Sequence, residues 1–436
     1  MSAAFLALAM AGCGGGGDAT LSPDFQTAAA DRALSERPEV AVASDGTVWL
    51  AWTERAAGLE SVESARIDRA GGTTLPTVSA ASGEVKRSAR VALSATTPVV
   101  AWREVGTAGD RIRVASHGGS GWIAEQGRGP FVTGDIDLLD AGAGRICLVW
   151  SELPPSGRIA RLVAIRAASG LWSPATTVPA PTDASLVVDE LHVGAADDGS
   201  LMAVWSEGPP SPSTAPTVRT LRAARFDPLL AAWQPAQTLD AGVAIVPRVV
   251  AGHGGRWLAH WISGDPLGVR ELRARRYAEG AWQDTARPVD PAAGGSVRDS
   301  TAAPQGGDLP WLAWRVDTTD VPPRVAVRAA RFDLATGTVS APTPIAAPGE
   351  PQATGLALRR GTDGRRALVW GTATGPSGPF FAVTRSDVWQ TASRLEPDPA
   401  ILANGPGLAA LPDGGFVATW FRDAGVRQDV VLRRLP

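Results

Sequence analysis

The sequence predicts an all-β chain that folds as an eight-bladed β-propeller in which every blade is a four-stranded antiparallel sheet. Three observations support this prediction: a tryptophan that recurs at a nearly constant spacing, a glycine turn at a fixed distance before it, and two strand-like runs after it. Repeats of about 40 to 50 residues with four strands each are typical of propellers. No long segment has the periodicity of a helix, so helical repeats are not favoured.

Each unit contains a strand-like segment that ends in tryptophan. The eight tryptophans of these segments are Trp52, Trp102, Trp150, Trp205, Trp261, Trp314, Trp370 and Trp420. Their successive spacings are 50, 48, 55, 56, 53, 56 and 50 residues, so eight units of similar size fill the chain.

A turn separates the first two strands of each unit. Six positions before the tryptophan, six of the units carry a glycine: Gly46, Gly144, Gly199, Gly255, Gly364 and Gly414. An aspartate precedes this glycine in four units, and Asp-Gly between apolar runs is a strong hairpin signal because both positions tolerate positive φ. The run before the turn is therefore the first strand, and the run with the tryptophan is the second.

The third and fourth strands follow a variable loop. The third strand is clearest in the runs 65–68, 224–227 and 330–333. The fourth often opens with a tryptophan, and these tryptophans are Trp122, Trp172, Trp233, Trp282 and Trp389. Since large and small residues alternate along the second strand, neighbouring blades can interdigitate, and we expect both sets of tryptophans to lie in the core. Trp49, Trp257 and Trp311 fall outside the common phase and are the better candidates for ligand contact.

The ring is expected to be closed by the N-terminal strand. The eighth unit has only three strands before the chain ends at Pro436, and the segment 24–29 repeats the fourth-strand pattern of residues 388–393. Pairing of this segment with the last unit would remove the open edge of the ring.

The first residues carry a targeting pattern. Residues 1–13 are apolar and end in Met10-Ala-Gly-Cys13, which resembles the lipobox of bacterial lipoprotein signal peptides, although the usual positive charges at the start are missing. The resemblance implies lipid attachment at Cys13 and a place in the cell envelope, at the periplasmic or surface face of the outer membrane. Residues 14–20 then form a glycine-rich tether, and residues 21–436 form a single propeller domain.

Composition excludes several classes of function. There are 41 Lys and Arg against 44 Asp and Glu, which gives a net charge of −3 and no basic footprint for nucleic acid. Cys147 lies in an apolar run without a partner and is expected to be a small buried residue. The four histidines show no metal-binding spacing and no phosphate-loop or dinucleotide motif occurs, so no metal, cofactor or catalytic residue is predicted.

Candidate ligand contacts lie near one end of the ring. Two positions after the repeat tryptophan, the first four units carry Glu54, Glu104, Glu152 and Glu207, whereas the last four carry Ser263, Val316, Thr372 and Arg422. These glutamates are either solvated residues at the start of a loop or one acidic half of a rim that meets a cation, a basic partner or sugar hydroxyls. Near the starts of the first strands, Arg248, Arg298 and Asp299, together with Arg37 and Arg87, can line the axis and meet an anion, or are ordinary loop charges.

The chain also resembles two propeller groups. Sialidase-like enzymes share turns such as Ser169-Gly-Leu-Trp172, but their tyrosine nucleophile has no counterpart here, because Tyr277, the one tyrosine, lies on a third strand. Quinoprotein-like propellers share the turn Asp333-Leu-Ala-Thr-Gly337. They include an outer-membrane barrel-assembly lipoprotein, which implies a lipid-anchored ring that binds proteins.

We therefore predict a membrane-anchored binding scaffold for protein partners in the cell envelope, with the partner on the face of the ring where the variable loops lie. The alternative is a carbohydrate-active, sialidase-like enzyme or a glycan-binding protein.

Overall fold

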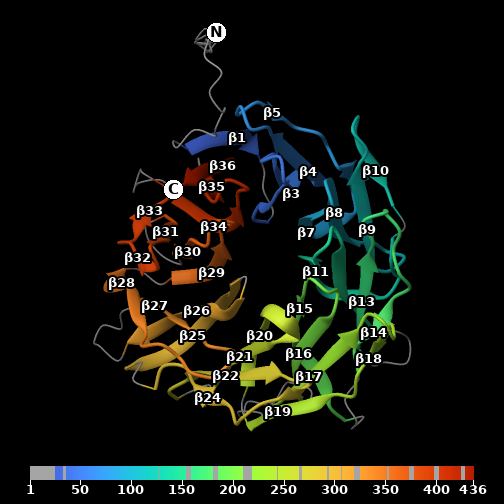
Figure 1. Ribbon diagram of the computed structural model, residues 1–436. Coiled ribbons are helices and arrows are strands. Elements are labelled where there is room, and N and C mark those ends of the chain that lie inside the picture. The colour runs from blue at the N-terminus through green and yellow to red at the C-terminus, as the bar shows by residue number, and fades with distance from the viewer. Residues whose placement is uncertain are drawn as a thin grey trace.

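Eight antiparallel sheets surround a common axis in the computed structural model, as the eight-bladed prediction requires (Figure 1). The structure describes residues 25–436 apart from short gaps, which are residues 33–35, 126, 154–158, 180–184, 210–218, 243, 265–267, 292–293, 306, 319–324, 351–352, 373–377, 397–401 and 424–427. Cys13, the tether and most of the longest predicted loop, Gly208–Pro216, lie outside the described residues. Within the described part of the chain, no helix is long and apolar enough to cross a membrane.

In seven blades the strands run in sequence order from the axis to the outside, and in the last blade the N-terminal strand takes the outermost place. The innermost strands are β2 (Glu39–Val42), β7 (Val85–Ser94), β11 (Val132–Asp140), β15 (Val187–Ala195), β20 (Ala244–Ala251), β25 (Gly295–Gln305), β29 (Ala353–Arg360) and β34 (Leu402–Ala410). The second strands are β3 (Val48–Ala56), β8 (Thr97–Val105), β12 (Ile146–Glu152), β16 (Leu201–Gly208), β21 (Trp257–Ser263), β26 (Gly307–Thr318), β30 (Arg366–Thr372) and β35 (Phe416–Asp423).

The outer half of each blade is less regular. The third strands are β4 (Leu59–Ile67), β9 (Arg111–His117), β13 (Ala160–Arg166), β17 (Arg219–Asp227), β22 (Glu271–Ala278), β27 (Val325–Arg331), β31 (Phe380–Arg385) and β36 (Gln428–Leu435). The outermost strands are β5 (Thr73–Thr74), β6 (Ser79–Ser82), β10 (Trp122–Ala124), β14 (Thr176–Thr177), β18 (Ala232–Trp233), β19 (Gln237–Gly242), β23 (Ala281–Trp282), β24 (Arg287–Pro288), β28 (Thr343–Glu350), β32 (Val388–Trp389), β33 (Ser393–Arg394) and β1 (Phe25–Arg32). A short 3₁₀ turn, η1 (His253–Gly255), joins β20 to β21.

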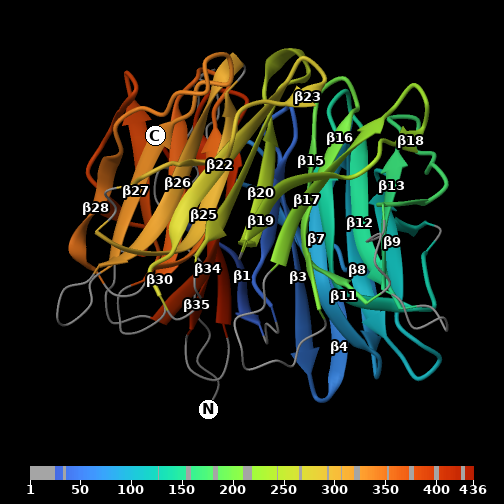
Figure 2. The ribbon, with the colours of Figure 1, turned by 90° about the horizontal axis from the view of Figure 1, so that it is seen from below.

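This connectivity gives the ring two different ends (Figure 2). We call the end with the turns between first and second strands, and between third and fourth strands, the turn face. The opposite end is the loop face, where the chain passes from second to third strands and from one blade to the next.

Hairpins form where the Asp-Gly pairs predict them, but only the glycine takes a positive φ, and the aspartate instead closes each turn with its side chain. Asp45 Oδ1 accepts a hydrogen bond from the Thr47 backbone N–H at 2.8 Å, and Gly46 between them has a φ of 87°. Asp198, Asp363 and Asp413 accept the corresponding bond at 2.8, 2.9 and 3.0 Å. The short polar side chain and the freedom of glycine thus fix the register of the first two strands.

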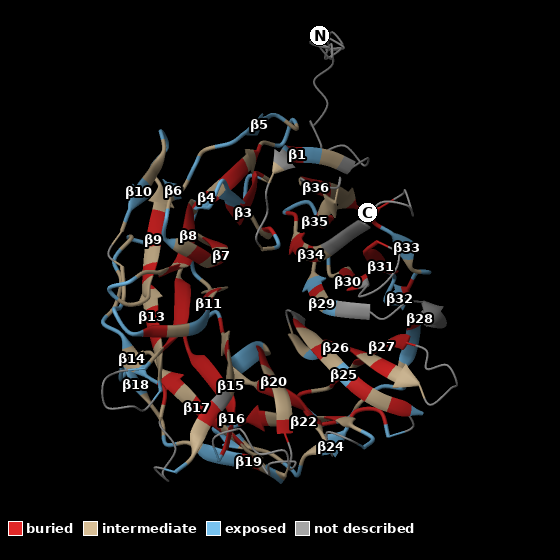
Figure 3. Cartoon of the chain, turned by 180° about the vertical axis from the view of Figure 1, so that it is seen from behind, coloured by how far each residue is buried: buried red, intermediate tan, exposed pale blue. Residues whose placement is uncertain are grey.

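The core consists of apolar side chains between adjacent blades. Figure 3 shows where the buried residues lie along the strands. All eight repeat tryptophans are at most 5% exposed. Trp52, for example, packs in one cluster with Val417 and Leu432 of the last blade. Burial of one such ring contributes about 4 to 6 kcal/mol before opposing terms, as an upper bound.

The three tryptophans outside the repeat phase are also structural. Trp49, Trp257 and Trp311 are 5%, 0% and 4% exposed, so the expectation that they contact a ligand is wrong. Trp49 packs edge-on against Trp122 at 5.8 Å, because the side chain three positions before the repeat tryptophan points to the other face of the strand, where the next blade lies.

The N-terminal strand closes the ring as predicted. Strand β1 pairs antiparallel with β36, with Gln26 opposite Leu432 and Arg32 opposite Gln428. Ala28 and Ala29 are buried in the cluster that contains Trp52 of the first blade. Arg32 forms an ion pair with Glu54 at 3.1 Å, so the closing strand is tied to the first blade as well as the last.

Removal of residues 1–36 should therefore lower the melting temperature and cause aggregation. The truncated chain would expose the unpaired edge of β36 and lose the packing of Ala28 and Ala29. Thermal unfolding and size-exclusion chromatography measure both effects. A chain that lacks only residues 1–20 is the control and should melt like the full chain; equal melting temperatures for both deletions would contradict this account of closure.

Candidate functional site

The four glutamates that follow the repeat tryptophans lie within the blades and not on an open rim. Glu54, Glu104 and Glu207 are 9%, 5% and 4% exposed, and Glu152 is half-buried. Three of them accept a hydrogen bond from the indole N–H of their own blade: Trp52 to Glu54 at 2.7 Å, Trp150 to Glu152 at 2.9 Å and Trp205 to Glu207 at 3.3 Å. Glu104 instead pairs with Arg113 at 2.9 Å.

The four glutamates therefore do not form the predicted acidic rim but stabilise the interior of the blades. A buried indole N–H or carboxylate without a partner is costly, and each such pair satisfies both groups. Arginines of the third strands complete the arrangement, as in the Arg222–Glu207 ion pair at 3.3 Å.

Two blades of the other half of the ring meet the same need with carboxylates from a different place. Trp261 donates to Asp240 at 3.1 Å, and Trp420 donates to Glu396 at 3.3 Å. Both carboxylates stand in the segment that leads out of the preceding blade, and Glu396 is fully buried. In the fifth and eighth blades, the loss of the glutamate after the tryptophan is thus offset by an acceptor from the preceding blade.

Seven of the eight innermost strands contain a bulge or irregularity near the loop face. Polar side chains at or near these irregularities connect neighbouring blades. The Ser88 hydroxyl donates to Asp135 at 2.7 Å, and Asp299 accepts from the Leu356 backbone N–H at 3.3 Å. Glu36 and Glu190 accept from the backbone N–H of Ser88 and Val246. The bonds fix the inner strands relative to each other close to the axis.

Directly beyond these irregularities, six ionisable side chains gather around the axis. We call Glu39, Arg90, Asp137, His192, Arg248 and Arg359 the axial cluster. The first five stand at one level, because each pairs with the residue just before the repeat tryptophan of its blade. Arg359, on β29, stands two residues farther toward the turn face. Arg359 is exposed and the others are half-buried, so solvent reaches all of them.

The charges of the axial cluster act on each other. Arg90 and Glu39 form an ion pair at 3.5 Å. Desolvation by the surrounding blades raises the pKa of Asp137, against the opposing effect of Arg90. Desolvation also lowers the pKa of Arg359, while Glu39 and Asp137 act to raise it. The cluster therefore holds both signs of charge in one shielded place.

Arg248 and Arg359 each donate one hydrogen bond to a backbone carbonyl, and their other N–H groups remain available toward the axis. Arg248 Nη1 donates to the carbonyl of Pro247 at 3.0 Å, and Arg359 Nη1 donates to the carbonyl of Leu358 at 3.0 Å. Neither forms an ion pair with any carboxylate among the residues that the structure describes. A guanidinium held this way can bind a carboxylate, sulfate or phosphate in two-point fashion.

His192 adds a neutral donor beside Arg248. Its Nδ1 accepts a hydrogen bond from the Val249 backbone N–H at 3.2 Å, which leaves the proton on Nε2. Burial, followed by the nearby charge of Arg248, lowers its pKa well below the usual value, so the ring is neutral at physiological pH.

Of the axial residues predicted from the sequence, only Arg248 belongs to the cluster. Arg298 is exposed and pairs with Asp317 of its own blade at 2.9 Å, and Asp299 links its blade to the next. Arg37 lies 3.4 Å from Glu39, and Arg87 lies 4.0 Å from Glu60. Five members of the cluster were not predicted from the sequence, although four of the five level residues share one phase, 13 positions before the repeat tryptophan. These five are Glu39, Arg90, Asp137, His192 and Arg359.

Two other residues singled out in the sequence, Cys147 and Tyr277, lie in the interior. Cys147 is fully buried, and burial raises the pKa of its thiol. Tyr277 is 3% exposed and packs against Trp282, so it lies inside a blade. Among the described residues, no group of three or more His, Cys, Asp or Glu side chains is arranged to hold a metal ion.

No protein-family model and no curated protein matches this chain. Solved structures do match, and they include the polysaccharide lyase Uly1, with 10% identity, a TM-score of 0.50, and coverage of 92% of this chain and 90% of that one. A PL25 ulvan lyase bound to -[GlcA(1-4)Rha3S]- matches with 10% identity and a TM-score of 0.50 over 83% of this chain and 94% of that one. The NanB sialidase from Streptococcus pneumoniae matches with 10% identity and a TM-score of 0.45 over 94% and 93%. At such identities the likeness establishes the fold alone.

The buried histidine next to the cluster predicts a pH dependence of stability. His260 is fully buried, its Nδ1 lies 3.2 Å from the Ser300 hydroxyl, and burial and then Arg248 lower its pKa to about 3. An unfolded histidine titrates near pH 6.5, so above that pH both states are neutral and the full stability is present. As the pH falls from about 6.5 toward 3, only the unfolded state takes up this proton, which costs about 1.4 kcal/mol per pH unit.

Denaturant unfolding of the wild type and the variant His260→Gln between about pH 7 and pH 4 measures this effect. The variant should lose less stability over this range, because it lacks one of the groups that the unfolded state protonates. If the free energy of unfolding falls equally with pH in both proteins, His260 does not contribute to the pH dependence.

Proposed function

We propose that this chain is a lipid-anchored envelope protein whose propeller binds a protein partner on the loop face, with an acidic group of the partner held by the axial cluster. The observation that carries the proposal is the state of Arg248 and Arg359, which are bonded to backbone carbonyls and not to a described carboxylate. An acidic side chain of the partner that enters along the axis would supply the carboxylate that both arginines lack among the described residues.

Exposed apolar residues on the loop face favour a protein partner. Phe131, Leu153 and Ile159 are 44%, 46% and 38% exposed, and all three stand where strands of the third blade begin or end on the loop face. The Leu153 backbone N–H donates to the Phe131 carbonyl at 2.8 Å, which holds two of them together. Apolar anchors next to charged groups are the usual composition of a protein interface.

The second candidate is an acidic glycan as the ligand. It is supported by the similarity in fold to polysaccharide lyases at a TM-score of 0.50, one of which is bound to a saccharide whose name contains a glucuronic acid and a sulfated sugar. Arg248 and Arg359 would then donate hydrogen bonds to the carboxylate or sulfate of such a glycan.

The anchor is tested by the variant Cys13→Ala. The wild type should fractionate with membranes and dissolve only in detergent, because acyl chains on Cys13 would hold it there. The variant should be soluble, with the same melting temperature, since residue 13 precedes the folded domain. A variant that still fractionates with membranes would contradict the anchor and leave the ligand site untouched.

The partner site is tested by capture from detergent-solubilised envelopes with wild type and with the double variant Arg248→Gln/Arg359→Gln. Proteins bound through the axial cluster should be lost from the double variant, at unchanged melting temperature. Arg385→Gln is the matched control, because Arg385 is an exposed arginine at the turn-face end of β31 and should leave capture unchanged. Equal capture by all three proteins would refute the role of the cluster.

The same proteins applied to acidic polysaccharides distinguish the two candidates. Saturable binding of the glycan that the double variant loses, without any protein lost on capture, would favour the glycan over the protein partner.

A further inference from the structure

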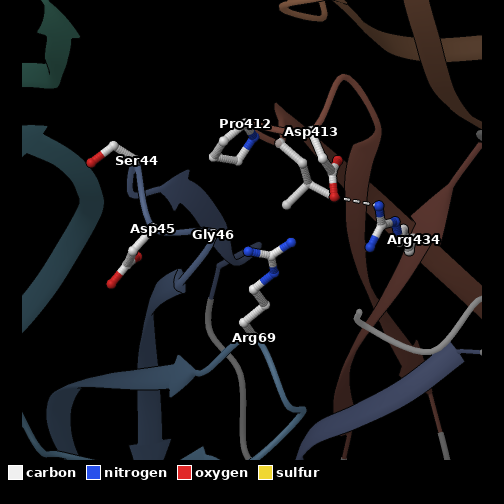
Figure 4. Close-up of a pocket in the computed structure, with 8 residues that line it drawn as sticks. Ser44, Asp45, Gly46, Arg69, Pro412, Asp413 and Arg434 are labelled. Atoms are coloured by element: carbon white, nitrogen blue, oxygen red, sulfur yellow. Dashed lines mark hydrogen bonds and ion pairs between the residues drawn. The ribbon is translucent and has the colours of Figure 1, made fainter. Parts of the chain in front are cut away.

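The turn face holds a cavity of about 270 Å³ where the last blade meets the first (Figure 4). The first blade contributes Asp45, Gly46 and Arg69, and the last blade contributes Pro412, Asp413 and Arg434. The cavity lies among the hairpin turns, and none of its lining residues belongs to the axial cluster.

No arginine crosses this junction from the turn of the last blade. The residue directly after the turn glycine is an arginine in the third, fifth and seventh blades, and it reaches the turn of the following blade. Arg145 Nη2 donates to the Asp197 carbonyl at 3.0 Å, Arg365 Nη2 donates to the Gly414 carbonyl at 3.2 Å, and Arg256 bonds to Asp308. In the last blade this position is Gly415, which has no side chain to cross the junction.

The carboxylates that line the cavity already have partners. Asp413 accepts from the Gly415 backbone N–H at 3.0 Å and pairs with Arg434, as the dashed line in Figure 4 marks. Asp45 accepts from the Thr47 backbone N–H, a bond that lowers the pKa of its carboxyl. Both groups are therefore committed as anions to donors at their own turns.

Arg69 is in a different state. Its stem lies over Gly46, and Figure 4 places its guanidinium in the middle of the lining residues, between the turns of the two blades. It has no hydrogen bond or ion pair with any residue that the structure describes. The group of the cavity that lacks a counterpart is thus a cation with five donors.

We propose that this cavity is a binding site for a small anion, a carboxylate or phosphate compound that the Arg69 guanidinium holds. The volume is slightly below the range of about 300 to 1,000 Å³ that is typical of small-molecule pockets, so a single small molecule fits and a polymer does not. A planar guanidinium between two walls suits two-point binding of a carboxylate or phosphate. The site is independent of the function proposed for the axis.

Isothermal titration of the full chain in detergent with inorganic phosphate, glucuronate and glucose tests the proposal. Phosphate or glucuronate should bind at one site per chain, and which of the two binds identifies the anionic group; neutral glucose should not bind. Arg69→Gln should weaken the binding at least tenfold without a change in melting temperature, because Arg69 is exposed and has no described partner to lose. Arg385→Gln, which changes an exposed arginine outside both the cavity and the axial cluster, is the control and should bind as the wild type does, whereas Arg248→Gln reports any binding at the axis.

A second variant fills the site without removing the charge. Gly415 does not have a positive φ, and an added Cβ would lie 3.2 Å from an oxygen of Asp413. Gly415→Arg should therefore be accommodated after a small shift of that side chain, cross the junction as Arg145 and Arg365 do, abolish anion binding and raise the melting temperature.

Three results would overturn the proposal: no anion binding by the wild type at millimolar concentration, equal binding by Arg69→Gln, or loss of binding only in Arg248→Gln, which would move the anion to the axis. If Gly415→Arg fails to fold, the comparison between Arg69→Gln and Arg248→Gln still decides.

Discussion

The insertion of one tryptophan per blade between neighbouring sheets is the constraint on which the rest of this ring depends. Each ring is almost fully buried, and its indole N–H enters a dry interior where an unpaired donor is costly. In five blades a carboxylate accepts that N–H, and arginines such as Arg32, Arg222 and Arg422 pair with the carboxylates in turn. Much of the charge of this nearly neutral chain is thus used inside the blades.

This use of charge decides where chemistry remains possible. The inner edge of each sheet has no further strand to pair with, and the bulges near the loop face turn polar side chains toward neighbouring blades. Beyond them the axial cluster brings together charges that lie far apart in the sequence, from Glu39 to Arg359. Since no single blade supplies a full set of partners at the axis, Arg248 and Arg359 remain without described carboxylates.

The repeat made most of the fold predictable from sequence. Spacing and turn chemistry are local signals, so the eight units, the Asp-Gly hairpins and the closing strand follow from short stretches of residues. The environment of Glu54 and Glu207 did not follow, because it depends on how far β3 and β16 continue beyond the tryptophan. The axial cluster could be predicted only in part from the sequence. The position 13 residues before the repeat tryptophan marks Glu39, Asp137, His192 and Arg248, but the irregularity in β7 shifts Arg90 by one position. Which arginine lacks a partner depends on blades hundreds of residues apart.

A ring of similar units offers the same surroundings at every junction, so a specific ligand can be held only where the repetition is broken. At the axial level the ionisable residues of five consecutive blades give way to Thr301, Ala357 and Gly407 in the last three, which makes one side of the axis polar and the other small. At the turn face, Gly415 leaves the junction that the chain termini close without the bridging arginine that the third, fifth and seventh blades carry. In both places the tryptophan core is intact, because the second strand keeps its pattern while the changed residues lie on its neighbours or in its turn. The core therefore tolerates departures from the repeat along the inner strands and in the turns. Those departures are where binding can differ from blade to blade.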